Sequence, residues 1–125
     1  MPDRHDVTVL SAAGMRTFIR ISERWGLNDS EAAAVIACGA SVIQDARHNR
    51  EIEGLTAEQL QRLSLVLGIY RAINILLPVP ARADVWLHRP NSAEIFGGRT
   101  PLELMSSNLI SDIVAVRKYV DAQLI

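Results

Sequence analysis

The sequence is poor in cysteine, lysine and aromatic side chains. It has one cysteine, Cys38, and one lysine, Lys118, and the aromatic fraction of its 125 residues is 5%. A single cysteine excludes an intramolecular disulfide and any zinc site built from several cysteines. Because aromatic residues are few and the hydrophobic fraction is 49%, aliphatic side chains and alanine must fill the core.

Long hydrophobic runs are also missing. The apolar stretch at residues 72–77 is followed at once by Pro78, and no run reaches the roughly 18 apolar residues of a membrane helix. Residues 1–9 carry charges where a signal peptide needs an apolar segment. We therefore expect a cytoplasmic protein that is neither exported nor inserted in a membrane.

The charge is nearly balanced, with 13 basic against 14 acidic residues and a net charge of −1. This balance argues against a protein that binds nucleic acid mainly by bulk electrostatics. Residues 1–53 carry six arginines against eight acidic residues, and residues 54–125 carry seven basic against six acidic residues. The N-terminal half is therefore the more acidic one.

Helical periodicity dominates the chain, and no segment has the sustained alternation typical of a strand. The sequence therefore predicts an all-α protein. Capping patterns and apolar spacing predict seven helices. They run from after Ser11 to Gly26, over Asp29–Ala37, Ala40–His48, Ala57–Leu77 and Pro80–His88, from Pro101 onward, and from Leu109 to the C-terminus. Capping boxes mark three of these starts, and they are formed by Asn28 with Glu31, Thr56 with Gln59, and Thr100 with Glu103.

The helix Ala57–Leu77 is predicted to be the longest and to lie at the centre of the fold, because its apolar residues, Ile75 among them, run nearly all round it. Residues 49–55 are polar, include Gly54 and are interpreted as a linker. We accordingly expect a degenerate helix-turn-helix unit at 1–55 and a second helical unit at 56–125.

A helix-turn-helix template fits the N-terminal half when Ala33 is placed at its fifth position. It places Ala32 and Ile36 on the core side of the first helix and directs Cys38, Ile43 and Ala46 inward, with Ala37 where the turn normally has glycine. The residues that could contact DNA are Ser41, Gln44, Arg47, His48 and Arg50. Asp45 lies among them and would repel phosphate. Two uses therefore stay open, which are DNA contact and packing or dimerisation.

Arg16, Arg20 and Arg24 stand four residues apart and form a basic stripe on the first predicted helix. The stripe could contact phosphates or an acidic partner. The favoured interpretation is a solvated face, tempered by the neighbouring Glu23.

Catalytic chemistry is not indicated. The three histidines have no carboxylate or cysteine at metal-ligand spacing and are interpreted as surface residues: His5, His48 and His88. Cys38 has no nearby histidine, which favours a buried small side chain over a nucleophile. Gly97-Gly98 is too short for a phosphate-binding glycine loop. We expect no enzyme, no metal site and no cofactor.

Two neighbouring segments are the most distinctive part of the chain. The first is Trp86-Leu87-His88-Arg89-Pro90-Asn91, and the second runs from Ile95 through Gly97-Gly98-Arg99-Thr100-Pro101 to Leu104. Trp86 and Phe96 supply large apolar surfaces, and the two glycines permit positive φ between elements. Asn91, with Glu94 three residues later, is predicted to cap the next helical element.

These two segments resemble the toxin-binding domain of the Xre/MbcA/ParS antitoxins. Both halves of the family's motif are present in the right order, and the helical layout of residues 56–125 also fits. The residues that carry the motif are Trp86, Pro90, Gly97, Gly98, Thr100, Pro101 and Leu104. In this interpretation they need not touch the toxin, because they can act by shaping the domain.

The resemblance implies that the partner is a RES-domain toxin encoded beside the antitoxin. Such a toxin attacks NAD or transfers ADP-ribose from it. It further implies a non-enzymatic antitoxin that blocks the toxin's NAD pocket in a heteromeric complex, commonly as a homodimer. Many members of the family also use an Xre-like helix-turn-helix to bind operator DNA and repress their own operon.

The candidate toxin-binding residues are Arg89, Asn91, Arg99, Arg117, Lys118, Tyr119, Leu124 and Ile125. We hypothesise that the last helix plugs the toxin cleft together with Arg99 and the turn at 89–99. The competing interpretation is that Val116, Val120 and Leu124 simply pack on the long helix.

Two further functions are weighed against the antitoxin. One is a DNA-binding regulator that uses the C-terminal domain for dimerisation or for another partner. The other is a small helical enzyme, which no constellation of residues supports.

Overall fold

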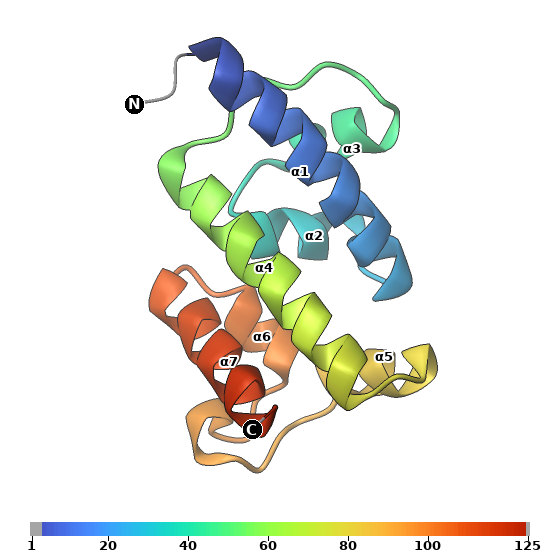
Figure 1. Cartoon of the computed structure of the whole chain (residues 1–125), viewed down its shortest axis with the longest axis vertical. Coiled ribbons are helices and arrows are strands. Elements are labelled where there is room, and N and C mark those ends of the chain that lie inside the picture. The colour runs from blue at the N-terminus through green and yellow to red at the C-terminus, as the bar shows by residue number, and fades with distance from the viewer. Residues whose placement is uncertain (1–3, 125) are drawn as a thin grey trace.

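The computed structural model describes residues 4–124, with side chains from Leu10 onward (Figure 1). This part of the chain is helical and contains no strand, which confirms the all-α prediction. Its elements are α1 (Arg4–Arg24), α2 (Asp29–Ile36), α3 (Ala40–Arg47), α4 (Ala57–Leu76), α5 (Pro80–His88), the 3₁₀ turn η1 (Glu94–Phe96), α6 (Pro101–Met105) and α7 (Ile110–Gln123).

Helix α1 is longer than predicted, since it begins at Arg4 and not after Ser11. No proline or glycine interrupts residues 4–13, so nothing local stops the helix from extending towards the N-terminus. With 21 residues it exceeds the 20 of α4, so the prediction that α4 is the longest helix was wrong. Its predicted core face is confirmed as buried: Met15, Phe18, Ile19, Ser22 and Trp25.

Three of the predicted capping boxes are present. The Asn28 side chain accepts a hydrogen bond from the Glu31 backbone N–H at 2.8 Å, while the Glu31 carboxylate accepts one from the Asn28 N–H at 3.0 Å. Thr56 with Gln59 and Thr100 with Glu103 form the same reciprocal pairs. Each box satisfies two backbone donors at a helix start, which is why these three starts lie where the sequence predicts them.

Helix α4 is central, as predicted. It packs against α7 on one side and against α1 and α2 on the other, with α5 at its C-terminal end (Figure 1). Leu63, Val66, Ile69 and Ile73 form its buried face. Ile75 departs from the prediction, because its side chain is 60% exposed.

The segment 49–55 is packed onto the body of the protein, so its interpretation as a linker needs correction. Ile52 and Leu55 are buried. The Leu55 backbone N–H donates to the Ser11 hydroxyl of α1 at 2.8 Å. Two apolar side chains and one buried hydrogen bond therefore anchor an otherwise polar segment. The division into units 1–55 and 56–125 stays a prediction, and α4 packs against elements of both.

The last helix packs by its middle and leaves its ends exposed. Ile113, Val116 and Val120 are buried, and α7 packs on α4 and α6. Leu109 and Leu124, predicted as part of the same apolar stripe, are 62% and 41% exposed. Within residues 4–124, no helix is both long and apolar enough to cross a bilayer.

Candidate functional site

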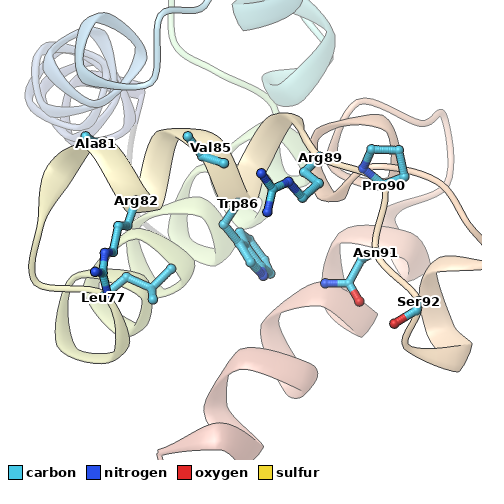
Figure 2. Close-up of a pocket in the computed structure, with 9 residues that line it drawn as sticks. All are labelled: Leu77, Ala81, Arg82, Val85, Trp86, Arg89, Pro90, Asn91 and Ser92. Atoms are coloured by element: carbon cyan, nitrogen blue, oxygen red, sulfur yellow. The ribbon is translucent and has the colours of Figure 1, made fainter.

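Helix α5 and the segment after it form a groove (Figure 2). The helix starts at Pro80, whose fixed φ suits the first position of a helix. The groove has a volume of about 640 Å³, and its lining residues are Leu77, Ala81, Arg82, Val85, Trp86, Arg89, Pro90, Asn91 and Ser92. In Figure 2 the Trp86 ring lies between the side chains of Leu77 and Arg82 on one side and those of Asn91 and Ser92 on the other.

The groove combines an apolar floor with two guanidinium groups. Arg82, Trp86 and Arg89 follow one another at i, i+4 and i+7, which places them along one side of α5. Both arginines are exposed, and neither forms an ion pair within the described part of the chain. Val85 adds an exposed apolar side chain. Such a surface fits a partner segment that offers a carboxylate next to apolar side chains.

A series of aromatic contacts fixes the wall of the groove to the rest of the domain. The Trp86 ring meets Phe96 edge-on with centroids 6.1 Å apart, and Phe96 meets Tyr119 of α7 in the same way at 5.1 Å. Phe96 is fully buried between them. Tyr119, a candidate toxin-binding residue, therefore supports the groove from behind with its half-buried ring.

Asn91 orders the chain that leaves the groove. Its side-chain oxygen accepts a hydrogen bond from the Ala93 N–H at 2.8 Å, and its backbone N–H donates to the Arg99 carbonyl at 3.1 Å. The prediction that Asn91 caps the next helical element was wrong, because the cap of η1 is Ala93, which makes no side-chain cap bond. Asn91 instead closes the loop 91–99 across its base.

The two glycines and Arg99 shape the far end of this loop. Gly97 and Gly98 have φ angles of 57° and 82°, and a Cβ at either would have open space. Glycine is therefore favoured there by the left-handed backbone and not by crowding. The Arg99 side chain is exposed and turns back, so that its Nε donates to the Phe96 carbonyl at 3.2 Å.

Apart from Tyr119, which supports the groove from behind, the candidate residues placed at α7 are not part of it. Arg117 lies across α4, where a Cβ on Gly68 would overlap its guanidinium, and its Nε donates to Asp121 at 2.9 Å. Arg117 and Leu124 line a separate hollow of about 480 Å³ between α4 and α7. Lys118 is exposed, and Ile125 lies outside the described residues. The structure thus brings Arg89 and Asn91 together but does not bring Arg117 to them.

The helix-turn-helix is formed by α2, a turn at Ala37 and α3. Ala32, Ile36 and Ile43 are buried as predicted, and Cys38 and Ala46 are half-buried against the core. Burial raises the pKa of the Cys38 thiol, so the thiol stays protonated at neutral pH and is a poor nucleophile. His48 and His88 are exposed as predicted, whereas the side chain of His5 lies outside those described.

The candidate DNA-binding arginines are held by carboxylates. The Nε of Arg47 donates to Asp29 at 2.7 Å, and the same guanidinium lies 3.9 Å from Glu23. Arg50 pairs with Asp45 at 3.2 Å. Ser41 and Gln44 are exposed, and the Nδ1 of His48 lies 2.8 Å from the Gln44 carbonyl. Helix α3 therefore offers the exposed uncharged side chains of Ser41 and Gln44, while Arg47 at its end and Arg50 just beyond it are paired with carboxylates.

Comparisons with known proteins cover almost the whole chain. Residues 72–123 match the antitoxin Xre/MbcA/ParS C-terminal toxin-binding domain, and residues 5–68 match the antitoxin Xre-like helix-turn-helix domain. The chain belongs to the Xre/MbcA/ParS family of antitoxins. Over 112 residues this antitoxin is also 35% identical to "Uncharacterized protein y4oB" of Sinorhizobium fredii (strain NBRC 101917 / NGR234), an alignment that covers 89% of the antitoxin and 84% of the relative.

Family membership confirms the resemblance and gives the two parts of the antitoxin their functions. The C-terminal domain implies a toxin partner, and the helix-turn-helix implies DNA binding. The groove of α5 lies wholly within the toxin-binding match. A family of antitoxins with a helix-turn-helix also favours a regulator over an enzyme.

The antitoxin has two important arginines that sequence reasoning missed. Arg82 could have been found from its i, i+4, i+7 spacing with Trp86 and Arg89. Arg62 of α4 is only 1% exposed. Arg62 lies four residues before Val66, on the helix face that packs into the core, and this spacing was the sequence signal that its side chain is buried.

Arg62 joins three elements of the antitoxin. Its two terminal nitrogens donate to the Val35 carbonyl of α2 at 3.5 Å and to the Ser107 carbonyl after α6 at 3.2 Å. Its Nε lies 3.8 Å from the Glu58 carboxylate and has no hydrogen-bond partner. The guanidinium thus links the helix-turn-helix to the toxin-binding domain through the core.

Proposed function

We propose that this antitoxin binds and neutralises a RES-domain toxin, one that consumes NAD or transfers ADP-ribose from it, by covering the toxin's active site. The antitoxin acts in the cytoplasm as a non-enzymatic homodimer within a heteromeric complex. The identity of the toxin rests on the family resemblance. The observation that carries the binding surface is the groove of α5, where two arginines without acidic partners flank Trp86.

The chemistry of the groove suits a tight protein interface. A guanidinium can hold a carboxylate through two parallel hydrogen bonds, and tryptophan and arginine are the residues most enriched where binding energy concentrates. An acidic side chain of the toxin would lie between Arg82 and Arg89, and an apolar neighbour would cover Trp86. The aromatic contacts with Phe96 and Tyr119 hold Trp86 in place before the toxin arrives.

In the proposal the remaining candidates act outside this groove. Asn91, Gly97, Gly98 and Thr100 fix the loop behind it through their backbone geometry and hydrogen bonds. The proposal assigns the exposed side chains of Arg99, Lys118 and Leu124 to the outer part of the interface, beyond the groove. Arg117 contributes by holding α7 on α4.

The groove can be tested in cells that co-express the neighbouring RES-domain gene product. We expect the wild-type antitoxin to restore growth and the double variant Arg82→Glu, Arg89→Glu to fail, because reversed charges repel the acidic partner. Truncating one member of a buried charge pair costs about 2–5 kcal/mol of binding energy. The dissociation constant of a single Arg89→Ala variant should therefore rise by at least about 30-fold.

A matched double variant, Arg16→Glu with Arg20→Glu, controls for the change in charge, because both residues are exposed on α1. It should protect as the wild type does. If the folded groove variant protects cells fully, the groove is not the toxin-binding surface.

Operator DNA binding is the second candidate function, and we propose that it represses the antitoxin's own operon. Two observations favour it, namely the geometry of α2, the turn and α3 and the match of residues 5–68 to the Xre-like helix-turn-helix domain. It is compatible with toxin neutralisation because it uses a different domain.

A further inference from the structure

The outer face of α1 carries a row of arginines without partners, Arg16, Arg20 and Arg24, named here the α1 stripe. All three side chains are exposed, and none forms an ion pair with another described side chain. At 1.5 Å of rise per residue the stripe extends over about 12 Å. Duplex DNA carries one negative charge per about 1.7 Å of its axis, so a surface of this length faces several phosphates.

The face that a helix-turn-helix normally presents to DNA is acidic in this protein. Asp29 and Glu31 lie in the first turn of α2, and Asp45 lies on α3. The arginines next to them, Arg47 and Arg50, are paired with Asp29 and Asp45. This face therefore has little positive charge left to offer a phosphate.

The α1 stripe begins next to the C-terminal end of α3. Arg16 lines the same hollow as Ala46 at the end of α3 and Asn49 and Arg50 just beyond it. Glu23 of α1 approaches Arg47, the last residue of α3, so both contacts lie at the C-terminal end of α3. DNA that lies against this end of α3 would therefore reach α1 as well.

We propose that the α1 stripe, and not α3, supplies the phosphate contacts when the helix-turn-helix domain binds DNA. The exposed uncharged side chains of α3, Ser41 and Gln44, are then the groups left to touch base edges. This inference rests on the DNA-binding part of the proposed function and is independent of toxin neutralisation.

The proposal has a measurable signature in the salt dependence of binding. Each phosphate neutralised contributes about 0.9 to the slope of log Kobs against log salt concentration. Three arginines of the stripe would together account for about 2.7 of that slope. Because phosphates carry no sequence information, loss of the arginine contacts to them weakens specific and non-specific DNA binding alike.

The test compares the full-length wild type with the triple variant Arg16→Gln, Arg20→Gln, Arg24→Gln. Affinity is measured between 50 and 200 mM KCl for two 40-base-pair duplexes, one from upstream of the protein's own gene and one of random sequence. We expect the slope to fall by about 2 to 3 on both duplexes. Arg71→Gln, an exposed arginine of α4 without an ion pair, should leave the slope unchanged.

A double variant, Arg47→Gln with Arg50→Gln, tests the alternative that α3 holds the phosphates. The proposal is overturned if this variant lowers the slope as much as the triple variant, if the triple variant keeps the wild-type slope, or if the wild type binds neither duplex. Circular dichroism verifies that each variant is folded. The triple variant should still neutralise the toxin. Failure of the phosphate-contact proposal therefore changes only the DNA-binding measurements, whereas failure of the antitoxin function changes toxin neutralisation.

Discussion

At the residue scale, Ala37 is the most unusual backbone position of the helix-turn-helix. It has φ 62° and ψ 48°, the left-handed region, in the turn between α2 and α3. A Cβ in this region costs about 1–2 kcal/mol. The conformation persists because the N–H groups of Ala37 and Cys38 close the end of α2 and because Gln59 donates to the Ala37 carbonyl at 2.9 Å.

We expect Ala37→Gly to raise the free energy of unfolding by about 0.5–1 kcal/mol. Glycine removes the strain, and the gain is reduced by the greater entropy that glycine gives the unfolded chain. Urea unfolding measures the change. Ala34→Gly, inside α2, is the matched control and should lower the free energy of unfolding by about 1 kcal/mol. A destabilised Ala37→Gly variant would contradict this description of the turn.

The position of this turn could be predicted from sequence, whereas the pairing of the nearby arginines with carboxylates could not. The template located the turn from the spacing of alanines and isoleucines, which is a local pattern. The pairing of Arg47 with Asp29 depends on residues 18 positions apart. Only the packing of α3 against α2 and α1 brings those groups together, so the five candidate DNA contacts could not be ranked in advance.

At the scale of elements, Arg62 explains how α4 holds two helix ends. The Val35 carbonyl is among the last four of α2, which have no partner within their own helix. A positive guanidinium satisfies it and also interacts favourably with the negative end of the helix dipole. The second hydrogen bond, to Ser107, ties down the chain between α6 and α7.

We expect Arg62→Ala to lower the free energy of unfolding by about 3 kcal/mol, because it leaves a cavity and two carbonyls without a donor. Glu58→Gln should cost less than about 1 kcal/mol, since the Glu58 side chain is 58% exposed and its pair with Arg62 is long. Chemical denaturation of both variants provides the test. Equal and small effects would show that Arg62 does not join the elements.

Helix boundaries were predictable where the signal is local. The capping boxes at Asn28, Thr56 and Thr100 are four-residue patterns, and each marks a helix start correctly. The exposure of Ile75 and Leu109 could not be predicted, because it depends on where neighbouring helices end. Periodicity identifies an apolar stripe but not the part of it that another element covers.

At the scale of the whole molecule, the small net charge conceals two basic surfaces. The α1 stripe carries three arginines and the groove carries two, while several acidic residues of the N-terminal half are used in ion pairs and caps. The two domains meet at Arg62 and again where the end of α1 and α5 share a hollow, lined by Trp25, Gly26, Val85 and others.

The most direct test of the proposed function is the rate of NAD consumption by the proposed partner, a purified RES-domain toxin encoded beside the antitoxin, titrated with this antitoxin. We expect NAD consumption to stop near one antitoxin protomer per toxin and to continue when Arg82→Glu, Arg89→Glu replaces the wild type. Arg16→Glu, Arg20→Glu should inhibit as the wild type does. Undiminished NAD consumption in the presence of excess folded wild-type antitoxin would contradict the proposal that it neutralises this toxin.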